Sequence, residues 1–136
     1  MRAVAVAAAL ILNGCAVPPA PTTTLVGRYT DSLVARDTPN WRGVVGTWVA
    51  EYRADGQFFV QQVGGMWIRG RYRLDGDALM IRDLEGTGSC THFGTDYASA
   101  SYRVHLTRSE LRFDALRDEC SPRRFGMTVH AWRRIP

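Results

Sequence analysis

Apolar and polar residues alternate along most of this 136-residue chain, which is the pattern of half-buried β-strands. Residues 66–74 show the pattern best, because Ile68 and Tyr72 share one face of the predicted strand while Arg69 and Arg71 share the other. Strands are expected at 24–34, 44–53, 57–63, 66–74, 78–84, 97–106, 110–116 and 125–134. No segment carries an apolar stripe with a period of 3.6 residues that is long enough to predict a helix.

Short turns separate several of these strands. Asp55-Gly56 and Asp75-Gly76-Asp77 are typical of tight hairpins, and residues 36–40 indicate a turn or a single helical turn. Strands that follow one another through tight turns favour an antiparallel meander. About eight strands close into a small barrel without free sheet edges. The predicted fold is therefore all-β, an antiparallel up-and-down barrel.

Cys90 and Cys120 lie in the two longer predicted loops, after the fifth and the seventh strand. In an up-and-down meander these loops lie at the same end, so a disulfide between the two residues agrees with the topology. The alternative is a metal site that adds His92, but its spacing does not match that of tetrahedral zinc ligands.

The N-terminus has the features of an export signal. Arg2 precedes the apolar run 3–12, and Asn13-Gly14-Cys15 follows it. A Cys after a small residue resembles the lipobox of bacterial lipoproteins. The resemblance implies that Cys15 receives lipid, with acyl chains such as palmitate, and anchors the protein outside the cytoplasm to the bacterial cell membrane. The alternatives are a membrane-spanning segment, for which the run is too short, and an ordinary cleaved signal with an incidental Cys.

These observations divide the chain into a signal peptide at 1–14, a tether at 15–24 and a barrel domain at 25–136. The tether is rich in Pro and Thr, which favours an extended chain. The formal net charge is +4, and every basic residue is Arg. The arginines are scattered among 13 acidic residues, which argues against a nucleic-acid partner.

Candidate catalytic residues are few. His105 and His130 fall out of phase with the apolar faces of their predicted strands, and His92 lies in a loop. Ser99 and Ser101 also face outward, and the chain has no Gly-x-Ser-x-Gly motif. Asp118 and Glu119 are expected to serve the second cysteine loop by accepting hydrogen bonds or pairing with the arginines at 123 and 124. We therefore expect no enzyme activity, no cofactor and no metal site.

Arg69, Arg71 and Arg73 share one face of a predicted strand. This face is either a solvated outer wall, paired with acids such as Glu51, or a docking face for anionic lipid head groups or polymers.

Several aromatic and aliphatic residues share the inward phase of the strands. They either fill the core or line a pocket at an open end of the barrel. The small inward residues Gly70, Ala98 and Ala100 either leave space for a ligand or admit large neighbours. As ligand-binding candidates we select Tyr52, Ile68, Tyr72, Tyr102 and Phe113.

Gly46-Thr47-Trp48 begins an early strand and Trp132-Arg133-Arg134 ends the last one. Together with the turns and cysteines between them, these motifs resemble small secreted bacterial lipocalin-like proteins over residues 25–134. The resemblance implies that Trp48 and an arginine, Arg133 or Arg134, stack to close one end of the barrel. Lipocalins usually carry Gly-x-Trp on their first strand, whereas here another strand precedes it.

The expected function is that of a non-catalytic, lipid-anchored binding module for a small apolar or amphipathic molecule. The alternative is a filled barrel that acts through its outer face as a structural or interaction protein of the cell envelope. A barrel void below about 300 Å³ would favour this alternative if no ligand binds.

Overall fold

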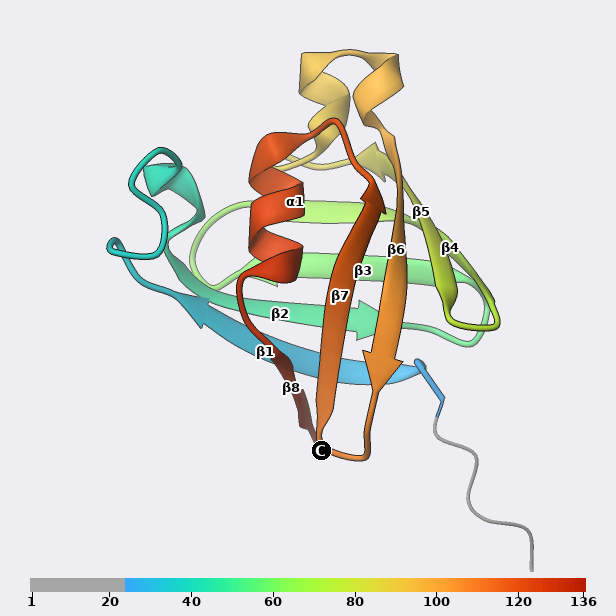
Figure 1. Ribbon diagram of the computed structural model, residues 1–136. Helices are drawn as coiled ribbons and strands as arrows, with labels where there is room; N and C mark the ends of the chain where they lie inside the picture. Colours follow the sequence, from blue (N-terminus) through green and yellow to red (C-terminus); the bar gives the residue numbers. More distant parts are fainter. Residues whose placement is uncertain (1–23) are drawn as a thin grey trace, which may run out of the picture.

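The computed structural model describes residues 24–136, whose backbone forms a closed barrel of eight antiparallel strands (Figure 1). The strands are β1 (Gly27–Leu33), β2 (Gly46–Tyr52), β3 (Gln57–Gln62), β4 (Trp67–Asp75), β5 (Ala78–Glu85), β6 (Ser99–Leu106), β7 (Glu110–Arg117) and β8 (Trp132–Ile135). Each strand pairs with its neighbours in sequence, and β8 pairs with β1 to close the barrel. The predicted all-β up-and-down barrel is confirmed.

The connections differ between the two ends of the barrel. Tight hairpins join β2 to β3, β4 to β5 and β6 to β7 at what we call the hairpin end. Gly56 and Gly76 have positive φ in the first two of these turns, as their turn motifs predict. Asp55 does not have positive φ, so the first turn is a type I turn followed by a left-handed glycine.

The opposite end, which we call the helix end, carries the longer connections. They contain the 3₁₀ helices η1 (Arg42–Val44), η2 (Cys90–Phe93) and η3 (Thr95–Tyr97), and the α-helix α1 (Ser121–Thr128). Residues 36–40 form turns, and the short helical turn comes just after them, in η1. None of the helices in the described part of the chain is long and apolar enough to span a membrane.

The predicted strand 125–134 is wrong in its first half. Residues up to Thr128 belong to α1, and β8 begins only at Trp132. Pro122 lies in the first turn of α1, where proline is well tolerated because that N–H needs no helical partner. Arg123 and Met127, four residues apart, bury the same face of the helix. The alternating apolar residues of this segment therefore reflect a short helix and not a strand.

The barrel interior toward the hairpin end is filled. Fully buried side chains include Tyr29, Leu79, Tyr102 and Leu111. The space beside Gly70 is occupied by the ring of Phe58, so this glycine admits a large neighbour and leaves no room for a ligand. For this half of the barrel, the filled-core interpretation holds.

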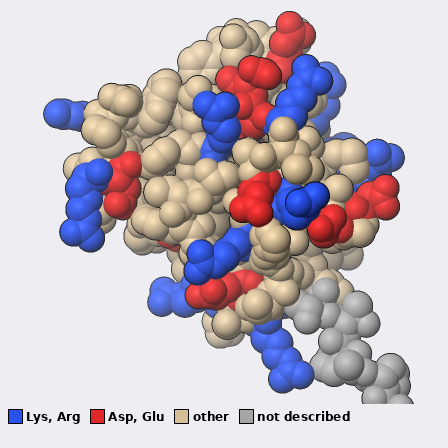
Figure 2. Space-filling model, in the orientation of Figure 1, with Lys and Arg blue, Asp and Glu red and all other residues tan. Residues whose placement is uncertain are grey.

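Residues 1–23 lie outside the described residues. The predicted signal peptide, Cys15 and nearly all of the tether fall within them, so these remain predictions. On the face drawn in Figure 2, arginines and acidic residues are interspersed over the surface of the barrel.

Candidate functional site

A cavity of about 280 Å³ lies inside the helix end of the barrel. Apolar side chains from the strands and α1 form most of its wall, among them Leu33, Trp48, Val60, Ile81, Met127 and Trp132. The polar part of the wall includes Asp83, Ser89, His92 and Arg123. The volume lies just below the range of about 300–1,000 Å³ that is usual for small-molecule pockets. The interior thus has a cavity toward the helix end and a packed core toward the hairpin end.

The five predicted ligand-binding residues divide between these two regions. Tyr52 and Ile68 line the cavity. Tyr102 and Phe113 pack edge to face in the filled core, with ring centroids 5.8 Å apart. Tyr72 packs on Tyr52 and donates a hydrogen bond to the Arg53 carbonyl oxygen, outside the cavity wall.

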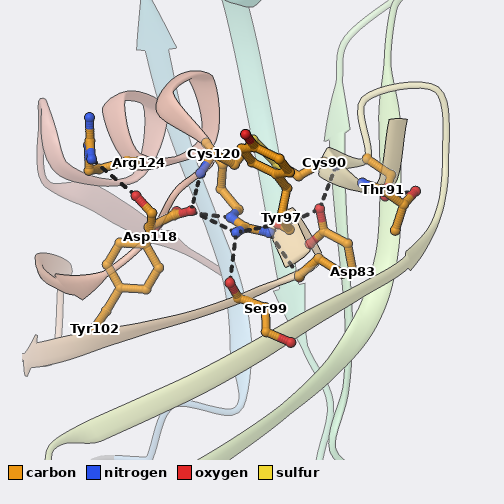
Figure 3. Close-up of a disulfide and its surroundings, with 12 residues drawn as sticks. Asp83, Cys90, Thr91, Tyr97, Ser99, Tyr102, Asp118, Cys120 and Arg124 are labelled. Atoms are coloured by element: carbon orange, nitrogen blue, oxygen red, sulfur yellow. Dashed lines mark hydrogen bonds and ion pairs between the residues drawn. A yellow bond between two sulfur atoms is a disulfide. The ribbon is translucent and has the colours of Figure 1, made fainter. Parts of the chain in front are cut away.

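Arg123 of α1, which lines the cavity, holds two buried carboxylates together. These are Asp83 and Asp118, labelled in Figure 3 together with Cys90 and Cys120. The Nε and Nη2 atoms of Arg123 donate to the two oxygens of Asp118 at 2.9 and 2.7 Å, and its Nη1 lies 3.2 Å from Asp83 Oδ2. The same guanidinium donates to the carbonyl oxygens of Tyr97, Ala98 and Ser99. The geometry positions α1 against the start of β6, because every donor of this side chain that points inward has an acceptor.

A disulfide joins the connection after β5, the strand that carries Asp83, to the loop that carries Asp118. Cys90 and Cys120 are bonded, as predicted, and both are buried. The amide of Cys90 donates to Asp83 at 2.9 Å, and the amide of Cys120 donates to Asp118 at 2.9 Å. The predicted role of Asp118 in the second cysteine loop is confirmed. The Arg124 guanidinium donates a hydrogen bond to the backbone carbonyl oxygen of Asp118 and not to the Asp118 carboxylate.

Burial changes the proton affinity of this cluster. Desolvation raises the pKa of Asp83, and the nearby Arg123 guanidinium opposes that shift without cancelling it. Desolvation also raises the pKa of the Tyr102 hydroxyl, which donates a hydrogen bond to Asp118 and is thereby held protonated. The pKa of Arg123 is raised: burial lowers it, but the hydrogen bonds that it donates to Asp118 and the charges of both carboxylates outweigh that effect.

Two buried polar atoms on the cavity residues have no hydrogen-bond partner within residues 24–136. They are Asp83 Oδ1, an acceptor, and Trp132 Nε1, a donor. A buried polar atom without a partner costs about 1–3 kcal/mol. A molecule in the cavity that supplies a donor to the first and an acceptor to the second would remove that cost.

The three histidines lie in separate places. His92 is exposed at the cavity and its Nε2 lies 2.9 Å from the Gly86 carbonyl oxygen. His105 is exposed on β6 and pairs with Asp114. His130 follows α1 instead of lying on a strand, and it is half-buried between Asp31 and Asp37 rather than pointing to solvent. The expectation for His130 is corrected because its segment is not a strand.

The aromatic partner of the terminal arginine differs from the expected one. Arg134 lies over the ring of Tyr29, 5.2 Å from its centroid, and donates to the Tyr29 hydroxyl and the Thr24 carbonyl oxygen. Trp48 instead lines the cavity and donates its indole N–H to the Val44 carbonyl oxygen. Arg133 is exposed on β8. The contact of Arg134 with Tyr29 ties the entry to β1 to the end of the chain.

The sequence predicted that Arg123 could pair with Asp118, and the structure has this ion pair. It did not predict that Arg123 is buried on a helix, nor that Asp83 belongs to the same cluster. Arg123 follows Ser121-Pro122, which is a helix-start signal, but the alternating apolar residues after it favour a strand. Asp83 lies in an inward position of β5, whose other inward residues are apolar. A charged residue at a position that the strand pattern predicts to be buried is a signal of a buried polar site.

Comparisons of the chain with protein-family models, with curated proteins and with solved structures found no match. The closed eight-stranded antiparallel barrel is compatible with a lipocalin-like fold.

Proposed function

We propose that this protein is a non-catalytic binding module whose cavity at the helix end takes a small, mostly apolar molecule bearing one polar group. The observation that carries the proposal is an apolar cavity whose wall residues include two buried polar atoms, Asp83 Oδ1 and Trp132 Nε1, that have no hydrogen-bond partner among the described residues 24–136. Apolar walls with a few well-placed polar groups are typical of small-molecule sites. The lipocalin resemblance supports the same function, and kinship with that family is part of the proposal.

The polar wall favours a particular kind of ligand head group. Asp83 and Asp118 carry two formal negative charges against the one positive charge of Arg123, so the cluster repels an anion in a poorly solvated site. Asp83 Oδ1 calls for a donor and Trp132 Nε1 for an acceptor. A hydroxyl group offers both a donor and an acceptor, whereas a carboxylate offers only acceptors. The expected ligand is therefore a small alcohol-like amphiphile rather than a fatty acid.

An exposed apolar residue of the cavity wall suits the entry of such a molecule. Phe93 lines the cavity and is 59% exposed. We further propose that Cys15 carries lipid and holds the barrel at the outer side of the bacterial cell membrane, where amphiphiles are available.

The test is binding of octanol, octylamine and octanoate to the purified protein, followed by tryptophan fluorescence and calorimetry. Trp48 and Trp132 line the cavity, so occupation changes their emission. Octanol should bind with saturation and more tightly than octanoate. If none of the three compounds binds with saturation, the proposal is contradicted and a filled-barrel interaction protein is favoured. The small volume of the cavity and the packed hairpin end are the observations that favour this alternative.

A matched pair of variants on α1 separates binding in the cavity from binding elsewhere. Gly126 lines the cavity, and a Cβ added there would meet only Leu33, at 4.0 Å, so Gly126→Leu should fill the space and abolish binding. Thr128→Leu adds a leucine to an exposed position of the same helix and should leave binding unchanged. Equal binding by both variants would show that the molecule binds outside the cavity.

A further inference from the structure

A second hollow lies on the outer wall of the barrel, over β4, β5 and β6. It is a groove of about 640 Å³, and four arginines line it: Arg71, Arg73, Arg82 and Arg117. Ser99 and Ser101 of β6 lie between them and add two hydroxyl groups. Asp96 and Glu119 also line the groove. These two acids offset part of the charge of the four arginines, and the formal net charge of the groove stays positive.

Strand register brings these arginines together. Arg71 of β4 lies directly opposite Arg82 of β5, and Arg82 lies opposite Ser99 of β6. In the next row Arg73 lies opposite Met80, whose other neighbour is Ser101, and Ser101 lies opposite Arg117. Like charges directly opposite one another on paired strands destabilise a sheet. An anion bound between the rows would attract the arginines on both sides and so offset their mutual repulsion.

The groove arginines differ from their neighbours in their pairing. Arg69 on β4 forms an ion pair with Glu85, and Arg103 on β6 forms one with Asp77. Within residues 24–136, none of the four groove arginines pairs with an acid; Arg73 bonds only the sulfur of Met80. Glu51, the expected partner of this arginine face, pairs instead with Arg53. Four guanidinium groups thus remain available in one hollow.

We infer that this groove binds phosphoryl oxyanions, through two or more guanidinium groups and the serine hydroxyls. Planar guanidinium groups match phosphate oxygens in pairs, and Ser hydroxyls donate to the remaining oxygens. The groove is shallow and open, so the phosphoryl group belongs either to a lipid head group or to a soluble phosphate ester. This site is separate from the cavity and does not depend on the function proposed above.

The experiment uses the full chain with Cys15→Ala, so that an anchor cannot hold the protein on membranes. Binding is measured to inorganic pyrophosphate by calorimetry and to phosphatidylglycerol–phosphatidylcholine vesicles by sedimentation. Arg71→Gln with Arg82→Gln should weaken binding by roughly tenfold or more, because each charge-assisted hydrogen bond contributes about 1.5 kcal/mol or more. Binding to pyrophosphate indicates a soluble ester, and binding to vesicles alone indicates a lipid head group.

The matched control is Arg28→Gln with Arg133→Gln, which removes the same charge from exposed strand positions outside the groove. It should weaken binding less than threefold, and both double variants should keep the melting temperature of the parent. Equal weakening by the two pairs would show attraction to net charge alone and overturn the inference. Failure of the parent to bind either probe would overturn it as well.

Discussion

Arg123 is the residue on which the helix end of the barrel depends. Its guanidinium bonds Asp118 with two donors, approaches Asp83, and reaches three carbonyl oxygens before and within β6. Burying three charged groups is favourable only when each finds partners of opposite charge and good geometry. Asp83 is the least satisfied of the three, because its Oδ1 has no partner in the part of the chain that the structure describes.

The pH dependence of stability should report on Asp83. Desolvation raises its pKa above the ordinary value of 3.8, so the folded protein holds this proton more tightly than the unfolded chain does. The contribution of Asp83 to the free energy of unfolding is therefore greatest below the ordinary carboxyl pKa. It declines as the pH rises through the raised folded-state value. Asp83→Asn removes this titration.

Urea unfolding of the parent and of Asp83→Asn, from about pH 3 to pH 7, tests this directly. The free energy of unfolding of the parent relative to the variant should fall as the pH rises through that window. A difference that stays constant with pH, or that grows in favour of the parent, would mean that burial does not raise the pKa of Asp83.

At the scale of elements, α1 and the disulfide complete the helix end. The strands follow their alternating residues closely. The segment before β8 departs most from the prediction, and Tyr97, expected to begin a strand, lies in η3. The segment before β8 contains Gly126 within its helix, where a glycine is less favourable than alanine by about 1 kcal/mol.

Gly126→Ala should raise the free energy of unfolding by about 0.5–1 kcal/mol, because the added Cβ meets only Leu33, at 4.0 Å. Gly70→Ala on β4 is the opposite case, since its Cβ would meet the Arg82 carbonyl oxygen and the Phe58 ring. It should destabilise the protein strongly. Denaturant unfolding of both variants measures the contrast, and loss of stability in Gly126→Ala would argue against a helix at this position.

Reduction of Cys90–Cys120 should lower the melting temperature by roughly 10 °C. The bond joins residues separated by 30 positions, and closing a loop of that length stabilises a fold by about 3–4 kcal/mol in the chain-entropy model. Thermal unfolding with and without a reductant gives the measurement. The double variant Cys90→Ala with Cys120→Ala should melt at the lower temperature in both conditions; a response of that variant to the reductant would point to another cause.

At the scale of the whole molecule, the barrel has a packed hairpin end and a hollow helix end. Every longer connection lies at the helix end because an up-and-down meander places alternate loops together. The described chain enters β1 at the hairpin end, where Arg134 bonds the Thr24 carbonyl oxygen. A lipid anchor at Cys15 would therefore join the barrel at the end opposite the cavity.

Cys15→Ala should move the protein from the membrane fraction to the soluble fraction of the producing cells. Two acyl chains hold a protein stably on a bilayer, whereas without them only weak surface attraction remains. Fractionation followed by immunoblotting measures the change, with Cys90→Ala plus Cys120→Ala as the variant that keeps Cys15. Unchanged membrane association of Cys15→Ala would contradict lipid attachment at this residue.

Local pattern by itself determined the class of the fold, the order of the strands and the pairing of Cys90 with Cys120, because alternation and tight turns leave an eight-stranded chain little choice but a closed meander. For the segment before β8 the local signals conflict, since Ser121-Pro122 favours a helix start and the alternating apolar residues favour a strand. In the tertiary structure this segment is a helix whose Arg123 is buried against Asp118. The tertiary structure also decided which inward residues fill the core and which line the cavity. Strand phase tells only that a side chain points inward, whereas the space around it depends on neighbours distant in sequence.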